Sequence, residues 1–297
     1  MGGIDGKTRI CGIFGYPVEH SFSPAMHNAA FDCLGMNWVY VPFAVKPADL
    51  SAAVAAVRAL NLAGVNVTVP HKQAVVEFMD RLSPAARLSG AVNTVVNSGG
   101  LLTGHNTDGE GFVRALEEEA GMQPAKAPAL ILGAGGAARA VAVALALNGC
   151  PEVVIANRTA GRAGELGDLI RNQTGCASSV LAWPGIPGRG SGEYHEWAGV
   201  LSRVRLVVQT TPLGMHPREG EVPPFPFEML NSGHVLVDLV YNPACTGFMK
   251  LGEAAGARVF NGMGMLLHQG AIAFELWTGQ KPPVDIMRNA LKISLRS

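Results

Sequence analysis

The sequence has no excess of either charge, because 23 basic and 23 acidic side chains among 297 residues leave a formal net charge of zero. A protein that binds nucleic acid or an anionic membrane through charge needs a basic surplus or stripe, so neither partner is expected. No uninterrupted apolar run approaches the roughly 18 residues of a bilayer span. The amino-terminal residues lack the apolar core of a secretion signal, and we expect a cytoplasmic protein.

The sequence also offers little from which to build disulfides or a metal centre. Its five cysteines are odd in number, widely spaced and free of any Cys-x-x-Cys pair, which is typical of reduced packing residues. Its eight histidines show no spacing typical of metal ligands, so no metal is expected. The hydrophobic content of 48% is enough to fill two ordinary domain cores.

An apolar run breaks into glycines at residues 129–139, Ala-Leu-Ile-Leu-Gly-Ala-Gly-Gly-Ala-Ala-Arg. This pattern indicates a strand, a tight turn and the start of a helix. Glycines let a pyrophosphate approach the free N–H groups at the positive end of that helix. The stretch is therefore a candidate dinucleotide loop, with a plain strand-to-helix turn as the alternative. Its candidate residues are Gly133, Ala134, Gly135, Gly136 and Ala137.

A second strand, predicted at residues 152–159, ends where a residue facing the adenosine ribose is expected. An NAD site usually places a carboxylate there, whereas this chain has Asn157, Arg158 and Thr159, with Arg162 one turn later. Because a guanidinium forks onto a 2′-phosphate that a carboxylate would repel, NADP is predicted over NAD. The alternative is that both arginines are simply solvated charges.

Short β-branched runs alternate with helical ones, which predicts an α/β protein with open, mostly parallel sheets. In the first half we predict strands at residues 9–15, 38–45, 64–69, 93–97 and 101–106, and helices at residues 23–34, 48–60, 71–80 and 108–120. The second half continues with helices at residues 137–148 and up to 172, and with strands at residues 179–183, 206–211, 234–241 and 258–261. The glycine-rich residues 184–192 are predicted to form a surface loop.

Three parts follow from this order. Residues 1–121 form a substrate-binding and catalytic domain, and residues 122–262 a Rossmann-like NADP-binding domain. Residues 263–297 provide two helices with no intervening strand, at 262–278 and 283–295, which we expect to pack back on the first domain.

Four segments of the first half carry polar residues at strand ends or helix starts, the edge where ligands bind in α/β sheets. They contain Ser21 and Ser23, then Thr68 and Lys72, then Asn93, and finally Asp108. Each residue has a structural explanation as a cap, a β-former, a turn residue or a solvated charge. Their recurrence after successive strands favours a shared site.

These motifs resemble those of the shikimate dehydrogenase family over residues 10–279. They read, in order, GYPVEHSFSPAMHN, NVTVPHK, GAVNT, NTDG, GAGGAARA, ANRT, TTPLGM, DLVYNP and GMLLHQGAIAFELW. The resemblance implies NADP-dependent, reversible reduction of 3-dehydroshikimate to shikimate in aromatic amino-acid biosynthesis, with Lys72 and Asp108 as the catalytic pair. It also implies substrate contacts by Ser21, Ser23, Thr68, Asn93, Tyr241 and Gln269, and a nicotinamide flanked by Leu239 and Gly262.

The implied chemistry suits these residue types. Hydride addition to a ketone puts negative charge on oxygen, to which the Lys72 ammonium can donate a hydrogen bond and then a proton. Asp108 can orient that ammonium and accept from a substrate hydroxyl, while the hydroxyls of Ser21 and Ser23 can hold a carboxylate without an arginine. Gln269 is a polar residue in an otherwise apolar helix, and a buried amide needs partners.

One position departs from the family pattern, because Gln209 stands where asparagine is common. Local hydrogen bonding at that point is therefore open. A quinate or dual quinate/shikimate dehydrogenase is the nearest alternative, and a non-catalytic NADP-binding sensor is the second. The expected partner is a small-molecule substrate, and assembly as a homodimer stays open.

Overall fold

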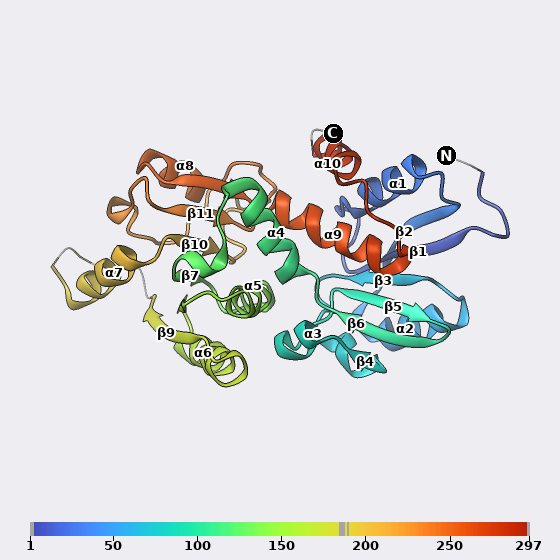
Figure 1. Cartoon of the computed structure of the whole chain (residues 1–297), viewed down its shortest axis with the longest axis horizontal. Helices are drawn as coiled ribbons and strands as arrows, with labels where there is room; N and C mark the ends of the chain where they lie inside the picture. The colour runs from blue at the N-terminus through green and yellow to red at the C-terminus, as the bar shows by residue number, and fades with distance from the viewer. Residues whose placement is uncertain (1–2, 184–187, 189, 296–297) are drawn as a thin grey trace. The chain divides into compact units, whose positions relative to one another are not determined.

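The computed structural model describes residues 3–183, 188 and 190–295. Contacts divide the chain into unit 1, with Met1–Gly111 and Leu266–Ser297, and unit 2, with Phe112–Met265. Each unit contains a six-stranded sheet covered by helices (Figure 1). The chain leaves unit 1 within α4 (Asp108–Ala120) and re-enters it within α9 (Met263–Thr278). The sequence-based domain boundaries at residues 121 and 262 stay predictions.

Unit 1 is built on a sheet of strand order β2-β1-β3-β5-β6-β4. Its strands are β1 (Arg9–Gly15), β2 (Trp38–Ala44), β3 (Gly64–Val67), β4 (Arg81–Leu82), β5 (Thr94–Ser98) and β6 (Leu101–His105). Strand β1 is parallel to β2 and β3, whereas β5 is antiparallel to β3 and β6. The end of β3, the start of β5 and the end of β6 therefore meet at one edge.

Helices cover both faces of this sheet. One face carries α1 (Ser23–Cys33), the carboxy-terminal part of α9 and α10 (Val284–Ser294), whose apolar side chains share one core cluster. The other face carries α2 (Leu50–Ala59), α3 (Pro84–Ser89) and the short 3-10 helix η2 (Ala74–Phe78), with η1 (Pro47–Asp49) leading into α2. The predicted return of the carboxy-terminal helices to the first domain is confirmed.

Unit 2 is built on a wholly parallel sheet of order β12-β11-β10-β7-β8-β9. Its strands are β7 (Ala129–Leu132), β8 (Glu152–Asn157), β9 (Ala177–Ala182), β10 (Leu206–Gln209), β11 (Val235–Asp238) and β12 (Arg258–Asn261). The order reverses beside β7, as in doubly wound nucleotide-binding sheets, where ligands bind at the carboxyl edge next to the reversal. The predicted α/β class with a Rossmann-type sheet is confirmed.

Besides the part of α4 from Phe112 on, unit 2 contains α5 (Gly136–Leu147), α6 (Ala160–Thr174), α7 (Gly192–Arg203) and α8 (Gly247–Ala254), with the 3-10 helices η3 (Pro124–Lys126) and η4 (Phe227–Met229). Leu130 and Leu132 of β7 share a core cluster with Trp197 of α7 and Phe248 of α8. The alternate residues of β7, Ala129 and Ile131, are equally buried, so the central strand is apolar on both faces, as a covered parallel strand must be.

Two local features of the fold were predicted wrongly or missed. The helix predicted at residues 71–80 is only η2, because the chain then enters the sheet, where Arg81 and Leu82 pair with β6. Helices α7 and α8 were not predicted, although Ser191 and Thr246 cap them with side-chain hydrogen bonds. Most of the loop predicted at residues 184–192 lies outside the described residues.

His27 of α1 is fully buried in an aromatic cluster of unit 1. Its ring stacks on Tyr40, with centroids 4.5 Å apart, and lies 5.3 Å from the ring of Trp277. Neither ring nitrogen has a hydrogen-bond partner among the described residues. Burial therefore lowers the pKa of His27 from 6.5 to about 3, which keeps the imidazole neutral.

This burial predicts acid sensitivity. Below pH 6.5 His27 becomes protonated in the unfolded chain, whereas in the folded chain it stays neutral down to about pH 3. The free energy of unfolding should therefore fall by about 1.4 kcal/mol per pH unit over this window through His27 alone. Urea unfolding of His27→Leu between pH 7.5 and 5 should show a correspondingly flatter dependence, while the exposed control His195→Leu should match the wild type. Equal slopes for wild type and His27→Leu would contradict the assignment.

Candidate active site

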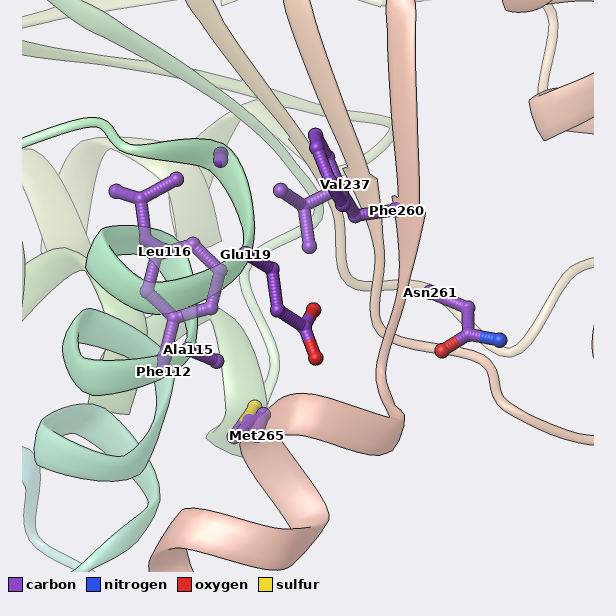
Figure 2. A pocket seen from close by; sticks show the side chains of 9 residues that line it. Phe112, Ala115, Leu116, Glu119, Val237, Phe260, Asn261 and Met265 are labelled. Atoms are coloured by element: carbon purple, nitrogen blue, oxygen red, sulfur yellow. The ribbon is translucent and has the colours of Figure 1, made fainter. Parts of the chain in front are cut away.

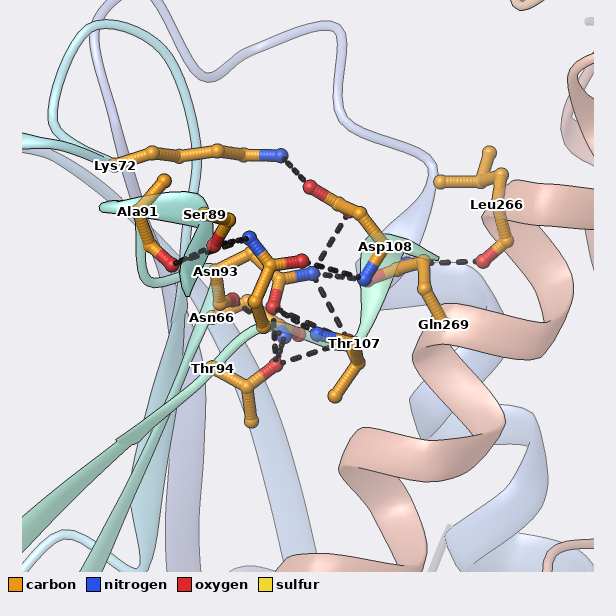
Figure 3. A network of polar contacts seen from close by, with 11 residues as sticks. Asn66, Lys72, Ser89, Ala91, Asn93, Thr94, Thr107, Asp108, Leu266 and Gln269 are labelled. Atoms are coloured by element: carbon orange, nitrogen blue, oxygen red, sulfur yellow. Dashed lines mark hydrogen bonds and ion pairs between the residues drawn. The ribbon is translucent and has the colours of Figure 1, made fainter. Parts of the chain in front are cut away.

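Lys72 and Asp108 form an ion pair at the edge of the unit 1 sheet (Figure 3). Lys72 lies in the turn after β3, and Asp108 is the first residue of α4, which follows β6. The Lys72 Nζ donates to Asp108 Oδ2 at 2.7 Å. The lysine side chain is 31% exposed and the aspartate side chain 9% exposed. One end of the pair is thus accessible to a ligand while the other is held in the protein.

Asn93, directly before β5, connects this pair to its surroundings. Its Nδ2 donates to Asp108 Oδ1 at 2.8 Å, to Thr107 Oγ1 at 2.9 Å and to Gln269 Oε1 at 3.3 Å. Its Oδ1 accepts the Thr107 N–H at 2.8 Å. Gln269 in turn donates to the Leu266 carbonyl within α9. The structure therefore brings four predicted residues, Lys72, Asn93, Asp108 and Gln269, into one network (Figure 3).

Tyr40 and Asn66 extend the network, and neither was among the predicted site residues. The Tyr40 hydroxyl donates to Asn66 Oδ1 at 2.8 Å, and Asn66 Nδ2 donates to Thr94 Oγ1 at 3.0 Å and to the Asn93 carbonyl at 3.1 Å. Burial raises the pKa of Tyr40 well above its ordinary value, against a hydrogen bond to Ser23 that lowers it. The available signal was an asparagine in the middle of an apolar strand, which requires a buried partner.

The two serines lie where the chain enters α1. Ser21 Oγ accepts the N–H of Ser23 at 3.3 Å. The suggestion that Ser23 caps the helix is wrong, because Ser23 is its first residue and the capping position belongs to Phe22. The Ser23 side chain is buried. Thr68 is half-buried, follows β3 directly and precedes Lys72 by four residues.

In unit 2, the glycine loop follows the central strand β7. Gly133 has a φ of +115°, and a Cβ there would lie 2.5 Å from Thr210 Oγ1, so only glycine fits. A Cβ on Gly135 or Gly136 would meet nothing within 4 Å, which leaves open space beside the first turn of α5. The first N–H groups of a helix have no intrahelical partner and suit an anion.

Arg139, in that first turn, was not predicted as a site residue. Its Nε is buried and has no hydrogen-bond partner among the described residues. The helix dipole disfavours a cation near a helix N-terminus. An arginine in the first turn of the helix after the glycine loop was therefore the sequence signal that could have indicated a bound anion. An anionic group at the start of α5 would supply both the missing acceptor and the missing charge, so these residues fit a pyrophosphate.

The residues predicted to face the adenosine ribose end strand β8, next to the glycine loop. The Gly133 N–H donates to the Ala156 carbonyl at 2.7 Å, which ties the loop to β8. Asn157 Nδ2 donates to the Thr159 carbonyl at 2.9 Å and shapes the turn into α6. Arg158 is exposed in this turn, and Arg162 is exposed in the first turn of α6. A guanidinium there is free to take a phosphate on the ribose side.

Leu239 and Gly262 lie together at the far end of the same edge. A Cβ on Gly262 would be 2.1 Å from the Leu239 carbonyl oxygen, so a side chain is excluded. The Gly262 N–H donates to Val240 O at 3.2 Å. Tyr241, two residues after Leu239, is also in unit 2, and burial raises its pKa. The other predicted substrate residues belong to unit 1.

A hollow of unit 2 lies among α4, β11, β12 and the start of α9 (Figure 2). Its lining is mainly apolar and includes Phe112, Leu116 and Phe260. None of the residues predicted for the site lines it. Within the described part of the chain, no group of three or more His, Cys, Asp or Glu could hold a metal, and no helix has the length and apolarity to cross a bilayer.

These features define a two-unit α/β protein that joins a Rossmann-type nucleotide-binding sheet to a unit with a lysine–aspartate pair. Family models match in the same order: the shikimate dehydrogenase substrate binding domain at residues 13–95, shikimate / quinate 5-dehydrogenase at 116–179, and the shikimate 5′-dehydrogenase C-terminal domain at 262–292. A shikimate dehydrogenase (NADP(+)) from Desulforamulus reducens is 54% identical over 97% of this chain and 96% of its own. The chain belongs to the shikimate dehydrogenase family.

Two solved structures show the same similarity. Shikimate 5-dehydrogenase from Listeria monocytogenes, in complex with shikimate and NAD, has a TM-score of 0.90 and 38% identity, covering 97% of this chain and 98% of that one. Quinate dehydrogenase from Corynebacterium glutamicum, in complex with NAD, has a TM-score of 0.85 and 33% identity, covering 96% and 99%. The fold is thus shared by enzymes that act on two related hydroxy acids.

The network around Asn93 predicts a specific stability loss. Asn93→Ala leaves Asp108 Oδ1 and the Thr107 N–H without their partners. Loss of hydrogen bonds to a buried charge and a buried backbone group should lower the free energy of unfolding by about 2–4 kcal/mol, as measured in urea. Asp108→Asn in the Asn93→Ala background should restore part of this loss, because the charge is gone. If the double variant is no more stable than Asn93→Ala, the buried charge is not what Asn93 stabilises.

Proposed function

We propose that this chain catalyses the NADP-dependent, reversible reduction of 3-dehydroshikimate to shikimate, the step that serves aromatic amino-acid biosynthesis. The observation that carries the proposal is the Lys72–Asp108 pair, with Nζ and Oδ2 2.7 Å apart and the lysine end accessible. In a family of shikimate dehydrogenases, such a pair can donate a proton to the oxygen of the ketone that is reduced. It also argues against a non-catalytic sensor, which needs no proton donor.

The substrate requires one anchor for its carboxylate and others for its hydroxyls. Ser21 and Ser23 offer two hydroxyls at the start of α1, where the helix dipole favours an anion. We assign the hydroxyl contacts to Thr68, Asn93 and Gln269, of which Asn93 and Gln269 belong to the network of the ion pair. The Asn93 amide is already engaged with Asp108, so its main contribution is to hold that carboxylate.

When bound, NADPH supplies the hydride that reduces the substrate ketone. Lys72 donates a hydrogen bond to the ketone oxygen and transfers a proton to it as negative charge develops there. Asp108 keeps Nζ in place and accepts from the neighbouring substrate hydroxyl through its own carboxylate. Oxidation of shikimate runs the same steps in reverse, with Lys72 accepting the proton.

The cofactor is assigned to the carboxyl edge of the unit 2 sheet. The open space beside Gly135 and Gly136, together with the orphaned Nε of Arg139, suits the pyrophosphate. Arg158 and Arg162 suit the 2′-phosphate, and Leu239 and Gly262 form the backbone surface for the nicotinamide. This set favours NADP, in agreement with the name of the Desulforamulus reducens relative.

Quinate is the second candidate substrate, because a quinate dehydrogenase shares the fold at 33% identity. Quinate is bulkier at the carbon that bears the carboxylate, so discrimination depends on the loop of Ser21 and Ser23. Specificity constants for shikimate and quinate, each with NADP⁺ and NAD⁺, measure the preference directly. We expect shikimate with NADP⁺ to have the highest value.

Substitution of the proposed acid tests the mechanism. Lys72→Ala should lower kcat for 3-dehydroshikimate by about 10²–10⁴-fold, the usual contribution of a general acid, and leave the KM for NADPH nearly unchanged. Turnover is followed by the loss of NADPH absorbance. Lys126→Ala, at an exposed lysine of η3, is the matched control and should behave as wild type. Turnover of Lys72→Ala within a few-fold of wild type would falsify the assignment.

Arg158 tests the cofactor preference. Arg158→Ala should raise the KM for NADP⁺ by roughly 10–100-fold, as expected for loss of charge-assisted hydrogen bonds, and change the KM for NAD⁺ little. Arg203→Ala is the control, because Arg203 pairs with Glu152 at the opposite end of β8. Equal changes for both cofactors would show that Arg158 does not read the 2′-phosphate.

A further inference from the structure

Gln209, the last residue of β10, is fully buried and folds the following loop around its amide. Its Nε2 donates to the carbonyls of Thr211 at 3.0 Å and Leu213 at 3.2 Å, and its Oε1 accepts the N–H of Thr211. Loops whose backbone groups are bonded to one buried side chain have a single preferred shape. The departure from the family's usual asparagine therefore still provides an amide that organises this segment.

The loop that Gln209 organises packs against Gly133, the first glycine of the dinucleotide loop. Thr210 Oγ1 donates to the Leu132 carbonyl at 2.7 Å. A Cβ on Gly133 would lie 2.5 Å from Thr210 Oγ1 and 3.2 Å from Thr211 Cγ2. The path of the chain at Gly133 is thus fixed from one side by residues 210 and 211, which Gln209 holds.

Gln209 also contacts the last residue of β11. Its Nε2 lies 3.3 Å from Oδ1 of Asp238, a fully buried carboxylate. Asp238 accepts the Val240 N–H at 3.0 Å and the hydroxyl of Thr246, the cap of α8, at 2.7 Å. Burial raises the pKa of Asp238 to about 6, against these hydrogen bonds, which lower it.

We infer that Gln209 and Asp238 are positioning residues for the dinucleotide, acting through the backbone of the Gly133 loop and of residues 239–240. This Gln209–Asp238 clamp joins the turns after β7, β10 and β11, three neighbouring strands at the reversal of the sheet. It does not supply a ligand group itself. The inference rests on the proposed function, since it takes the carboxyl edge of unit 2 as the NADP site.

The length of the side chain matters in this clamp. Glutamine contacts the loop carbonyls and Asp238 from one position, and asparagine, which is shorter by one methylene, should keep only part of these contacts. Methionine has the same length and no donors, so it keeps the packing and removes all the hydrogen bonds. Gln209→Met and Gln209→Asn therefore separate packing from positioning.

Calorimetric titration with NADP⁺ and, separately, with shikimate tests the inference. Gln209→Met should raise the Kd for NADP⁺ by roughly tenfold or more, Gln209→Asn should be intermediate, and the Kd for shikimate should stay at the wild-type value in both. Ser178→Ala, which removes one side-chain hydrogen bond to Val153 O elsewhere in unit 2, is the matched control and should bind both ligands normally.

Several results would overturn the inference. Unchanged NADP⁺ affinity in both variants would do so, as would equal losses for NADP⁺ and shikimate, which indicate general damage. If Gln209→Met does not fold, Gln209→Asn alone decides, since an unchanged Kd there also contradicts the clamp. Failure of the wild type to bind NADP⁺ would instead reject the proposed function, so the two outcomes are distinguishable.

Discussion

The carboxylate of Asp108 is the group around which unit 1 is arranged. With its side chain only 9% exposed, it would cost several kcal/mol to bury without compensation. Three features compensate: the Lys72 ammonium, the Asn93 amide and the positive end of α4, at whose first residue Asp108 stands. A pair that is one-third exposed at the lysine adds little to stability, so stability does not explain it. Its value is chemical, because it holds a proton donor at a fixed point beside an accessible edge.

Close backbone contacts at glycine bring Gln269 to Asn93, which holds this carboxylate. A Cβ on Gly111 of α4 would lie 2.6 Å from the backbone nitrogen of Gln269, and a Cβ on Gly270 would lie 2.1 Å from the Met26 side chain of α1. Helix α9 is therefore in direct contact with α4 on one side and α1 on the other. This contact sets Gln269 Oε1 3.3 Å from the Asn93 amide. A residue 176 positions away in sequence thus completes the network, because a glycine at each of these two crossings lets the helices approach closely.

Sequence reasoning succeeded where the signal was local and periodic. The glycine loop after β7 and the polar residues at successive strand ends follow from alternation, chain order and the rule that parallel strands present their carboxyl ends together. Sequence reasoning failed where contacts between distant parts of the chain determine the local structure. The helix predicted at residues 71–80 is reduced to η2, and the chain then joins the sheet at Arg81 and Leu82, because β6 offers Thr103 and Gly104 as partners. The Gln269–Asn93 contact could be implied by family resemblance only, since no local pattern encodes a contact across so much of the chain.

Tyr40 illustrates a residue whose importance no sequence pattern reveals. In β2 it is one inward-facing aromatic of an alternating strand, and packing alone would explain it. Its hydroxyl, however, donates to Asn66, whose amide donates to the Asn93 carbonyl. Buried hydrogen bonds thereby join Tyr40 of β2 to the residue that holds the Asp108 carboxylate. Since every buried polar group in such a network depends on its neighbours, the position of the proposed acid–base pair depends on a tyrosine that is two hydrogen bonds away from Asn93.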